Sequence, residues 1–371
     1  MLLIVTASFL FVYAALIGFY LYQWLQTEEF EIGEEESVSI SVVIAARNEA
    51  ENIGTLLRCL QAQSYPEALY EVIVVDDFST DDTARVLRSF EWQLLRIITP
   101  GVEEHKSSKK ICLEAGIKAA TGDLIVVTDA DCVVPEHWLR YIAGFQQQRN
   151  AVFIAAPVKL KTYTRLLSIF QSLDFITLQG ITAASVRANF HSMCNGANLA
   201  YLKTAFFEVN GFAGIDKIAS GDDMLLMYKI WSKHPDRVHY LKTRRAIVET
   251  TPMETWKSFF YQRVRWSSKA TYYQDRRVSA VLLFVYLLNF LFFVLLVVAF
   301  CWPGGWTMLM IYLVGKVVIE LPFVYIISRF YGEEKWMIFF PFLQPLHITY
   351  VVVVGLLSQF GAYEWKGRRT K

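Results

Sequence analysis

Residues 124–132, LIVVTDADC, join a short apolar run to an acidic turn. The run Leu124–Val127 is rich in β-branched residues, which is typical of a strand covered on both faces of a mostly parallel sheet. Asp129 and Asp131 follow at its carboxyl end, where open α/β sheets bind their ligands. Two such carboxylates can share one Mg²⁺ or Mn²⁺, which prefer oxygen ligands. The alternative is a polar turn that only ends the strand, because short acidic motifs are common.

Apolar strands alternate with helical segments around this turn. Strands are expected at Val38–Ala45, Val72–Val75 and Arg96–Thr99, and helices at Arg47–Gln63 and Ile111–Ala120. Crossovers of this length give a parallel sheet with flanking helices, which is the α/β class. The sequence has no G-x-G-x-x-G fingerprint and no P-loop, which argues against nicotinamide chemistry and phosphate hydrolysis. Acidic strand ends instead suit ribose hydroxyls, a base edge and a metal-bound diphosphate.

The composition is too apolar for two soluble domains. Of 371 residues, 54% are hydrophobic, so membrane segments are expected. The net charge of +1 gives no overall field that would attract nucleic acid. The five cysteines lack metal-ligand spacing and are expected to be reduced, in a chain whose main domain faces the cytosol.

Four apolar stretches are candidates for membrane spans. Met1–Leu25 has no charged residue, and we expect it to be a membrane anchor that is retained and not a cleaved signal peptide. Val278–Cys301 and Trp306–Ile327 are two more spans, joined by a Pro-Gly-Gly turn. Met337–Phe360 contains two prolines and either crosses fully or takes a re-entrant or interfacial course. The sequence leaves these two courses open.

Isolated charges occur within apolar segments. Leu166–Ala184 has Asp174 as its only acid, and we expect it at the membrane surface or beneath the site. Lys316 and Glu320 lie one helical turn apart inside an expected span. They either neutralise each other or mark a polar path through the membrane, and self-pairing is favoured.

Three further segments carry candidate site residues. Asn195 and Gly196 belong to a small-residue turn at which a ligand can approach the backbone. Asp222 and Asp223 begin a helix, where acids serve either as caps or in catalysis. The basic segment 242–277 directly precedes a span and therefore favours the cytosolic side. It contains Gln262, Arg263, Arg265 and Trp266 of a Q-R-V-R-W motif, although the tryptophan could also be an interfacial anchor.

In order and spacing, these motifs resemble membrane-bound glycosyltransferases of family 2. The resemblance rests on the strand with N-E, VVDDFSTD, TDAD, GDD and QRVRW, and it covers Val38 to Trp266. Cellulose synthase, hyaluronan synthase and ceramide glucosyltransferase are similar members of the group. The resemblance implies a GT-A fold with N-terminal and C-terminal transmembrane helices, a nucleotide-sugar donor such as a UDP-sugar, and inversion at the anomeric carbon.

The resemblance also implies a role for each matching residue. Asp223 would be the general base, and Asp129 and Asp131 would hold Mg²⁺ or Mn²⁺ with the donor diphosphate. The nucleotide-sugar would contact Ala45, Arg47, Glu49, Asp76, Asp77, Lys109 and Asp129. The acceptor and diphosphate cleft would be lined by Asn195, Gly196, Asp222, Gln262, Arg263, Arg265 and Trp266. The chain departs from polymerising relatives at Gly221-Asp222, where they usually carry T-E, and it has fewer spans.

These expectations give a domain plan and a leading hypothesis. We expect an anchor at 1–27, an acidic linker at 28–37, a GT-A domain with interfacial helices at 38–277, and a membrane domain with a basic tail at 278–371. The protein would be a multi-pass protein of the plasma (inner) membrane that transfers a hexose to a lipid or short glycan acceptor on the cytosolic face.

Three alternatives stay open at this point. The chain could be a processive polysaccharide synthase that extends and exports a glycan. It could be a non-catalytic nucleotide-sugar-binding membrane protein or scaffold. A nucleotidyltransferase would leave the basic face next to the membrane unexplained. The expected partners are a nucleotide-sugar, an acceptor and the bilayer, and no nucleic acid.

Overall fold

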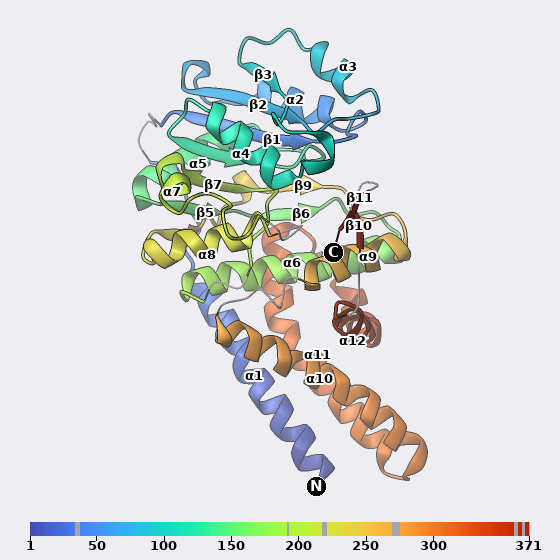
Figure 1. Cartoon of the computed structure of the whole chain (residues 1–371). Helices are drawn as coiled ribbons and strands as arrows, with labels where there is room; N and C mark the ends of the chain where they lie inside the picture. The colour runs from blue at the N-terminus through green and yellow to red at the C-terminus, as the bar shows by residue number, and fades with distance from the viewer. Residues whose placement is uncertain are drawn as a thin grey trace.

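The computed structural model describes residues 1–33, 38–190, 193–216, 221–268, 275–359, 363–365 and 368–370. Its centre is a seven-stranded sheet in the order β3-β2-β1-β4-β7-β5-β8 (Figure 1). The strands of this sheet are β1 Ile40–Ala46, β2 Tyr70–Asp76, β3 Leu95–Ile98, β4 Leu124–Val127, β5 Phe153–Ala155, β7 Leu199–Leu202 and β8 Val238–Tyr240. Two small sheets pair β6 Val158–Leu160 with β9 Val248–Thr250, and β10 Tyr363–Trp365 with β11 Arg368–Thr370.

The first half of the sheet is parallel, as the sequence predicts. Strand β1 pairs in parallel with both β2 and β4, and Ile40 lies opposite Tyr70 on one side and Leu124 on the other. All four residues of β4 are buried, which confirms the strand expected at Leu124–Val127. Strand β7 is inserted antiparallel between β4 and β5, so the sheet is mixed but mostly parallel. The carboxyl ends of β1, β2 and β4 therefore meet at one edge.

Both faces of the sheet are covered. Helix α4 packs closely on one face, and glycine at position 116 permits this close packing. A Cβ on Gly116 would lie only 2.4 Å from Cγ1 of Val43. The flanking helices are α2 Ile53–Gln61, α3 Thr83–Arg88, α4 Lys109–Ala119, α5 Trp138–Arg149, α7 Lys203–Glu208, α8 Met224–Lys233 and α9 Trp256–Ser267. Short 3-10 turns occur at η1 Glu67–Leu69, η2 Glu104–Lys106, η3 Arg244–Ala246 and η5 Glu334–Phe339.

One sequence prediction about these helices is wrong. The helix expected from Arg47 begins only at Ile53. Asn48 has a φ of 52°, which is left-handed and breaks the helix, and its Oδ1 accepts a hydrogen bond from the Thr80 backbone N–H at 2.8 Å. The residues after β1 therefore form a loop that is tied to the loop after β2.

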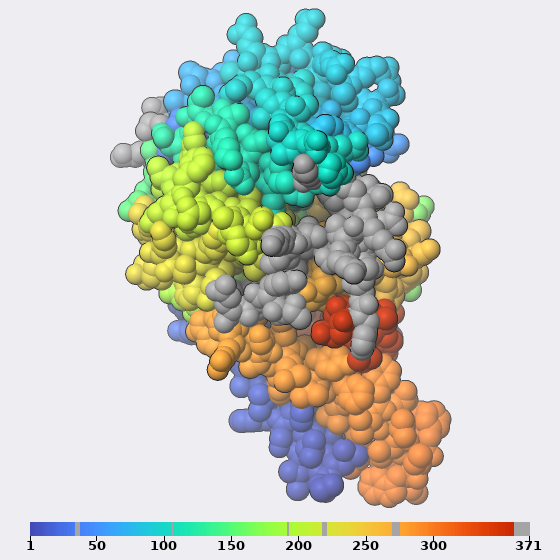
Figure 2. Space-filling model, in the orientation of Figure 1, coloured from blue at the N-terminus to red at the C-terminus, as the bar shows by residue number. Residues whose placement is uncertain are grey.

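Five helices are long and apolar enough to cross a membrane, within the described part of the chain. They are α1 Leu2–Gln26, α6 Leu166–Arg187, α10 Arg276–Cys301, α11 Gly305–Tyr331 and the segment Glu334–Leu357 that contains α12 Phe340–Leu357. The spans expected from Met1, Val278 and Trp306 thus correspond to α1, α10 and α11. In Figure 2, α1 and α10 project from the rounded head of the molecule.

Helices α6 and α12 lie differently from these three. Figure 1 shows α6 across the underside of the sheet, and 72% of its apolar window is buried inside the protein. This position agrees with the expectation that the segment lies beneath the site. Helix α12 is seen nearly end-on in Figure 1, at a large angle to α10 and α11. The segment is nonetheless among the described helices that are long and apolar enough to cross a membrane.

The polar pair inside α11 is buried and satisfied. Lys316 forms an ion pair with Glu320, and Gln344 of α12 contacts both side chains, with 2.5 Å from its Nε2 to Glu320 Oε2. Tyr13 of α1 donates a hydrogen bond to the same carboxylate. The favoured prediction of self-pairing is confirmed, and the pair also holds three helices together.

Lys242 attaches the anchor helix to the sheet domain. Its Nζ donates to the carbonyl oxygens of Trp24 at 3.0 Å and Thr27 at 2.6 Å, at the carboxyl end of α1, and lies 4.4 Å from the centre of the Trp24 ring. Burial lowers the pKa of this ammonium from its ordinary value. The lysine thus adds a charged donor at the carboxyl end of α1, where the Trp24 carbonyl otherwise accepts from the Thr27 backbone N–H at 3.2 Å.

A Lys242→Met variant is expected to lose about 1–3 kcal/mol of stability, because two carbonyl oxygens lose a charged donor. Thermal unfolding of the detergent-purified protein measures the loss. Lys118→Met is the matched control, since it removes only an exposed i,i+4 ion pair with Glu114. Equal melting temperatures for the two variants would contradict the capping role.

Candidate active site

A cavity of about 1790 Å³ begins at the acidic edge of the sheet and continues between the long apolar helices. Its lining includes Asp77, Asp129 and Asp131 at one end, and side chains of α1, α6, α9, α10, α11 and α12 at the other. Tyr13, Val285 and Phe323 are examples from α1, α10 and α11. A ligand in this cavity can therefore contact both the sheet edge and the long apolar helices.

Five aspartates from three segments line the sheet end of the cavity, together with Glu49 from the loop after β1. Asp77 follows β2, Asp129 and Asp131 follow β4, and Asp222 and Asp223 precede α8. Parallel pairing of β1 with β2 and β4 brings the first three together, since these strands end at the same edge. The Asp223 Oδ1 also accepts a hydrogen bond from the Met224 backbone N–H at 2.7 Å, so this acid caps α8.

The acids after β4 repel one another. Burial, together with the carboxylates of Asp129 and Glu49, raises the pKa of Asp131 to about 6. Thr250 of β9 donates a hydrogen bond to Asp131 Oδ2 at 3.2 Å. A bound divalent cation would relieve this repulsion, so the donor set fits Mg²⁺ or Mn²⁺.

The protein alone supplies few ligands for such a cation. Within the described residues, no group of three or more His, Cys, Asp or Glu side chains could hold a metal ion. One or two carboxylates completed by substrate phosphates and water are the usual arrangement for Mg²⁺. Asp129 and Asp131 would therefore hold the cation only together with a phosphorylated ligand.

Lys109, the first residue of α4, lies between two of the acids. Its Nζ is 2.7 Å from Asp129 Oδ1 and 3.1 Å from Asp222 Oδ2. Burial acts to lower its pKa, but these two carboxylates outweigh burial and raise the pKa above its ordinary value. A Cβ on Gly196 would lie 3.2 Å from the same Nζ, so the Asn195-Gly196 turn closes over the lysine.

A Lys109→Met variant should depend more strongly on divalent metal than the wild type does. Removing the ammonium leaves Asp129 and Asp222 without their common partner, so Mn²⁺ should raise the melting temperature of the variant by more than that of the wild type. Thermal scans with and without Mn²⁺ measure both shifts. Lys118→Met on the same helix is the control, and an equal or smaller Mn²⁺ shift in Lys109→Met would refute the neutralising role.

The loops after β1 and β2 form the wall beside Asp77. Arg47 Nη1 donates to the Asp77 carbonyl oxygen at 2.6 Å, and Asn48 N–H donates to Ser79 Oγ at 3.0 Å. Phe78 has a φ of 52°, so the second loop also turns through a left-handed residue. Asp77 is only 2% exposed, which leaves its side chain on the cavity wall and away from bulk solvent.

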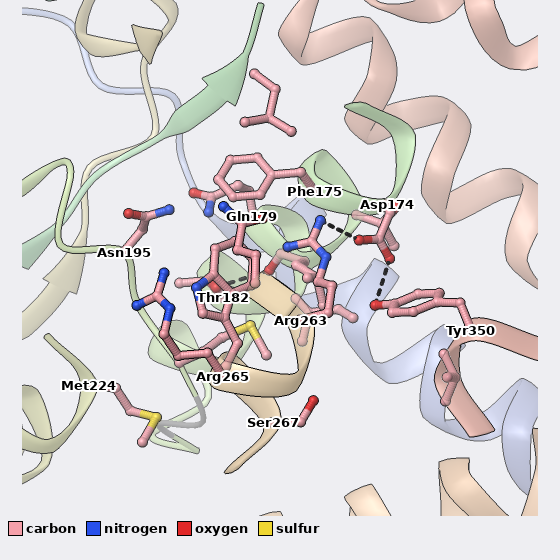
Figure 3. Close-up of a pocket in the computed structure, with 18 of the residues that line it drawn as sticks. Asp174, Phe175, Gln179, Thr182, Asn195, Met224, Arg263, Arg265, Ser267 and Tyr350 are labelled. Carbon is pink, nitrogen blue, oxygen red and sulfur yellow. Dashed lines mark hydrogen bonds and ion pairs between the residues drawn. The ribbon is translucent and has the colours of Figure 1, made fainter. Parts of the chain in front are cut away.

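Helix α9 sends two arginines in different directions. Figure 3 shows the Arg265 guanidinium on the side of Asn195, and the Arg263 guanidinium on the side of Asp174 and Tyr350. Arg263 Nη2 is 2.7 Å from Asp174 Oδ2. The Arg263 guanidinium carbon lies 4.3 Å from the Trp266 ring centre, which orients the tryptophan against a buried cation. The Q-R-V-R-W motif thus contributes one arginine to each side of the cavity.

Comparison with protein families decides the class of this site. The family described as "Glycosyltransferase like family 2" matches residues 38–269, which is more than half of the chain. The chain belongs to glycosyltransferase family 2. The resemblance expected over Val38 to Trp266 is therefore confirmed.

Individual relatives of this family 2 member are distant. It is 25% identical over 240 residues to a probable glycosyltransferase, YdaM, of Bacillus subtilis, covering 63% of the chain and 55% of that protein. It is 24% identical over 231 residues to the poly-beta-1,6-N-acetyl-D-glucosamine synthase of Staphylococcus epidermidis, covering 62% of the chain and 53% of that protein. The chain thus spans about half the length of these relatives.

The fold of this family 2 member also has a solved counterpart. The mannosyltransferase PcManGT of Pyrobaculum calidifontis, in complex with GDP-Man and Mn²⁺, superposes with a TM-score of 0.63. The match covers 97% of this chain and 98% of that chain at 17% sequence identity. The expected GT-A fold, with apolar helices at both termini, is confirmed.

Nearly every site residue expected of this family 2 member lines the cavity. Those that do are Ala45, Arg47, Glu49, Asp77, Lys109, Asp129, Asp131, Asn195, Gly196, Asp222, Asp223, Gln262, Arg263, Arg265 and Trp266. Asp76 does not, because its side chain points from the adjacent strand position into a separate hollow with Arg88 and Thr99. Its Oδ1 accepts a hydrogen bond from the Ser79 backbone N–H at 3.1 Å. Asp76 thus stabilises the turn next to Asp77.

Sequence reasoning missed several residues of the cavity. Thr250 contacts Asp131 from a three-residue strand that carries no recognisable motif. His347 lies on α12, and its Nε2 is 3.6 Å from Asp174 Oδ1. Asp174 and Arg263 were both noted in the sequence, but their pairing was not predicted. The only sequence signal for the pair is that an acid in an apolar helix needs a buried cation as its partner. Nothing in the sequence indicated that these two helices touch.

Proposed function

We propose that this protein is an inverting, metal-dependent hexosyltransferase that moves a sugar from a nucleotide-sugar, with a UDP-sugar as the first candidate donor, to a membrane lipid or short glycan. The observation that carries the proposal is the continuous cavity. It brings the acids of three segments and the arginines of α9 to one space that reaches the membrane helices. Family membership supports the reaction class.

The nucleotide-sugar is proposed to lie along the edge of the sheet. Asp77 and Glu49, with Arg47 bracing the backbone of Asp77, would contact the nucleoside. Asp129, Asp131 and Lys109 would face the diphosphate. A cation bound there would neutralise the charge that develops on the leaving nucleoside diphosphate. Arg265, on the Asn195 side of the cavity, adds a second positive charge for the same purpose.

The transfer needs one base and no enzyme nucleophile. The acceptor hydroxyl oxygen attacks the anomeric carbon, and its proton passes to the Asp223 carboxylate. A glycosidic C–O bond forms as the bond from the anomeric carbon to the phosphate oxygen breaks, and the diphosphate leaves with that electron pair. Attack opposite the leaving group inverts the configuration, and a positioned base contributes about 10²–10⁴ in rate.

The position in the cell is proposed from the membrane helices and basic residues. Residues 1–27 would anchor the chain, 28–37 would link the anchor to a cytosolic GT-A domain at 38–277, and 278–371 would complete a multi-pass inner-membrane protein. The positive segment 242–277 before α10 supports the cytosolic orientation.

A processive synthase is the second candidate, because one relative bears the name of a polysaccharide synthase. Product size separates the two functions. The full-length protein in lipid nanodiscs is incubated with Mn²⁺, a panel of nucleotide sugars and membrane lipids, and products are read by mass. Single-sugar additions support the proposal, and a ladder of long products supports the synthase. Absence of both transfer and donor hydrolysis across the panel would favour a non-catalytic nucleotide-sugar-binding protein.

A further inference from the structure

The membrane end of the cavity contains a polar cluster that the transfer chemistry does not use. We define the head-group cluster as Asp174 of α6, Arg263 of α9, and His347 and Tyr350 of α12. All four side chains line the cavity. The Tyr350 hydroxyl donates to Asp174 Oδ1 at 3.3 Å, and Figure 3 shows this bond beside the Arg263–Asp174 ion pair. Three helices thus bring their polar groups to one point.

Arg263 has donors that no described residue accepts. It is only 2% exposed, and its Nε and Nη1 make no hydrogen bond within the described part of the chain, while Nη2 is paired with the Asp174 carboxylate at 2.7 Å. The Nδ1 atom of His347 is also buried and has no hydrogen-bond partner among the described residues. Buried donors are nearly always satisfied, because an unsatisfied one costs about 1–3 kcal/mol. Both side chains line the cavity, so a ligand that enters it is a candidate acceptor for these hydrogen bonds.

The surroundings of the cluster are apolar. Val278 and Val285 of α10, Phe323 and Val324 of α11, and Val351 of α12 line the same cavity as the cluster. Apolar walls on helices that project from the sheet domain suit the hydrocarbon chains of a lipid. A ligand with a polar head and apolar chains therefore matches this end of the cavity.

The charge of the cluster distinguishes between lipid classes. Among the described residues, Arg263 and Lys316 are buried cations at this end, and each is paired with a buried acid, Asp174 or Glu320. His347 lies in the field of both pairs. A lipid phosphate at this point would place one or two negative charges beside two carboxylates, and the buried cation next to each carboxylate is already paired with it. A neutral head group with hydroxyl and carbonyl oxygens can accept from Arg263 and His347 without that penalty.

We infer that the head-group cluster binds the head of a neutral, hydroxyl-bearing lipid of the diacylglycerol or ceramide type and positions it as the sugar acceptor. This inference rests on the proposed transfer function and narrows its acceptor. The Arg263 guanidinium carbon lies 4.9 Å from the centre of the Phe259 ring and 4.3 Å from that of Trp266. These two rings hold the guanidinium in place, so the N–H donors of Arg263 have a defined direction. The cluster is thus a specificity site separate from the acids at the sheet edge.

Lipid binding to the detergent-purified full chain tests the inference. The probes are dioleoylglycerol, an N-oleoyl ceramide and undecaprenyl phosphate, titrated without donor and followed by native mass spectrometry. At least one neutral lipid should bind, and the tighter of the two identifies the backbone that is recognised. Arg263→Gln and His347→Ala should each weaken its binding by about tenfold or more, because each removes hydrogen bonds to the head group. Lys335→Gln, an exposed cation outside the cavity lining, is the matched control.

A cooperative thermal unfolding transition, measured on the same samples, is the check on folding. A variant without this transition is set aside as misfolded, and the other variant then decides. The inference is overturned if undecaprenyl phosphate binds more tightly than both neutral lipids, or if neutral-lipid binding is unchanged in the folded variants. Should both variants be misfolded, the wild-type preference between neutral lipid and lipid phosphate decides alone. Failure of the transfer proposal looks different: lipid binding persists while no sugar is transferred.

Discussion

An Asp223→Asn variant will lose sugar transfer by about 10²–10⁴-fold, because an amide cannot take the proton of the acceptor hydroxyl. The side chain lies on the cavity wall, and a Cβ on Gly196 opposite would be 3.7 Å from its Cβ. Asn keeps an oxygen that accepts the hydrogen bond from the Met224 N–H, so the start of α8 stays capped. Transfer assays with a limiting acceptor, alongside UDP binding, measure the two effects separately.

The control for this variant is Asp236→Asn, an exposed acid outside the cavity lining. An Asp223→Ala variant adds the loss of the cap and should be less stable than Asp223→Asn by about 0.5–2 kcal/mol. If Asp223→Asn retains substantial transfer while Asp223→Ala is destabilised, the acid is only a helix cap and the assignment as base is wrong.

The second large effect is expected at Asp131. An Asp131→Asn variant should bind UDP in the presence of Mn²⁺ at least about tenfold more weakly, because one of the two charged metal ligands is lost. In the absence of Mn²⁺, this variant should bind UDP nearly as tightly as the wild type does, since Asp77 and the loops after β1 and β2 are unaltered. Calorimetric titrations of UDP with and without Mn²⁺ give both values.

Asp76→Asn is the matched control for Asp131. It is also an acid at the end of a parallel strand, but its carboxylate lies outside the cavity and accepts from the Ser79 N–H, a bond that Asn can keep. The variant should therefore bind UDP with Mn²⁺ as the wild type does. A Mn²⁺ dependence that is the same in Asp131→Asn and the wild type would count against the metal site.

Local sequence signals predicted the first half of the sheet well. Strand β4 lies at the expected Leu124–Val127, and the apolar runs of β1 and β2 are buried on both faces, because fully covered parallel strands need continuous apolar residues. The acids at Asp77, Asp129 and Asp131 were found for the same reason, since a strand end fixes where the following side chains lie.

The second half of the sheet could not be predicted in this way. Strands β5, β6, β8 and β9 have three residues each, too few for a period of two to be recognised. Strand β7 is antiparallel only because of its tertiary position between β4 and β5. Helix α2 begins late because Asn48 adopts a left-handed conformation to bind the neighbouring loop.

The membrane end of the site depended on contacts between distant segments. Arg263 was expected in a cleft, but its pairing with Asp174, 89 positions earlier, depends on how α6 and α9 pack. His347 comes from the last apolar stretch, whose course the sequence left open. A charge inside an apolar segment predicts that a partner exists, but it does not identify the partner.

The central claim is that the acids after β2 and β4 hold one metal-bound nucleoside diphosphate in a cavity that continues into the membrane helices. A cryo-electron microscopy structure of the full-length protein in lipid nanodiscs with Mn²⁺ and UDP tests it most directly. We predict metal density next to Asp129 and Asp131, with the base beside Asp77. Nucleotide density outside this cavity, or metal density that does not contact either carboxylate, would contradict the claim.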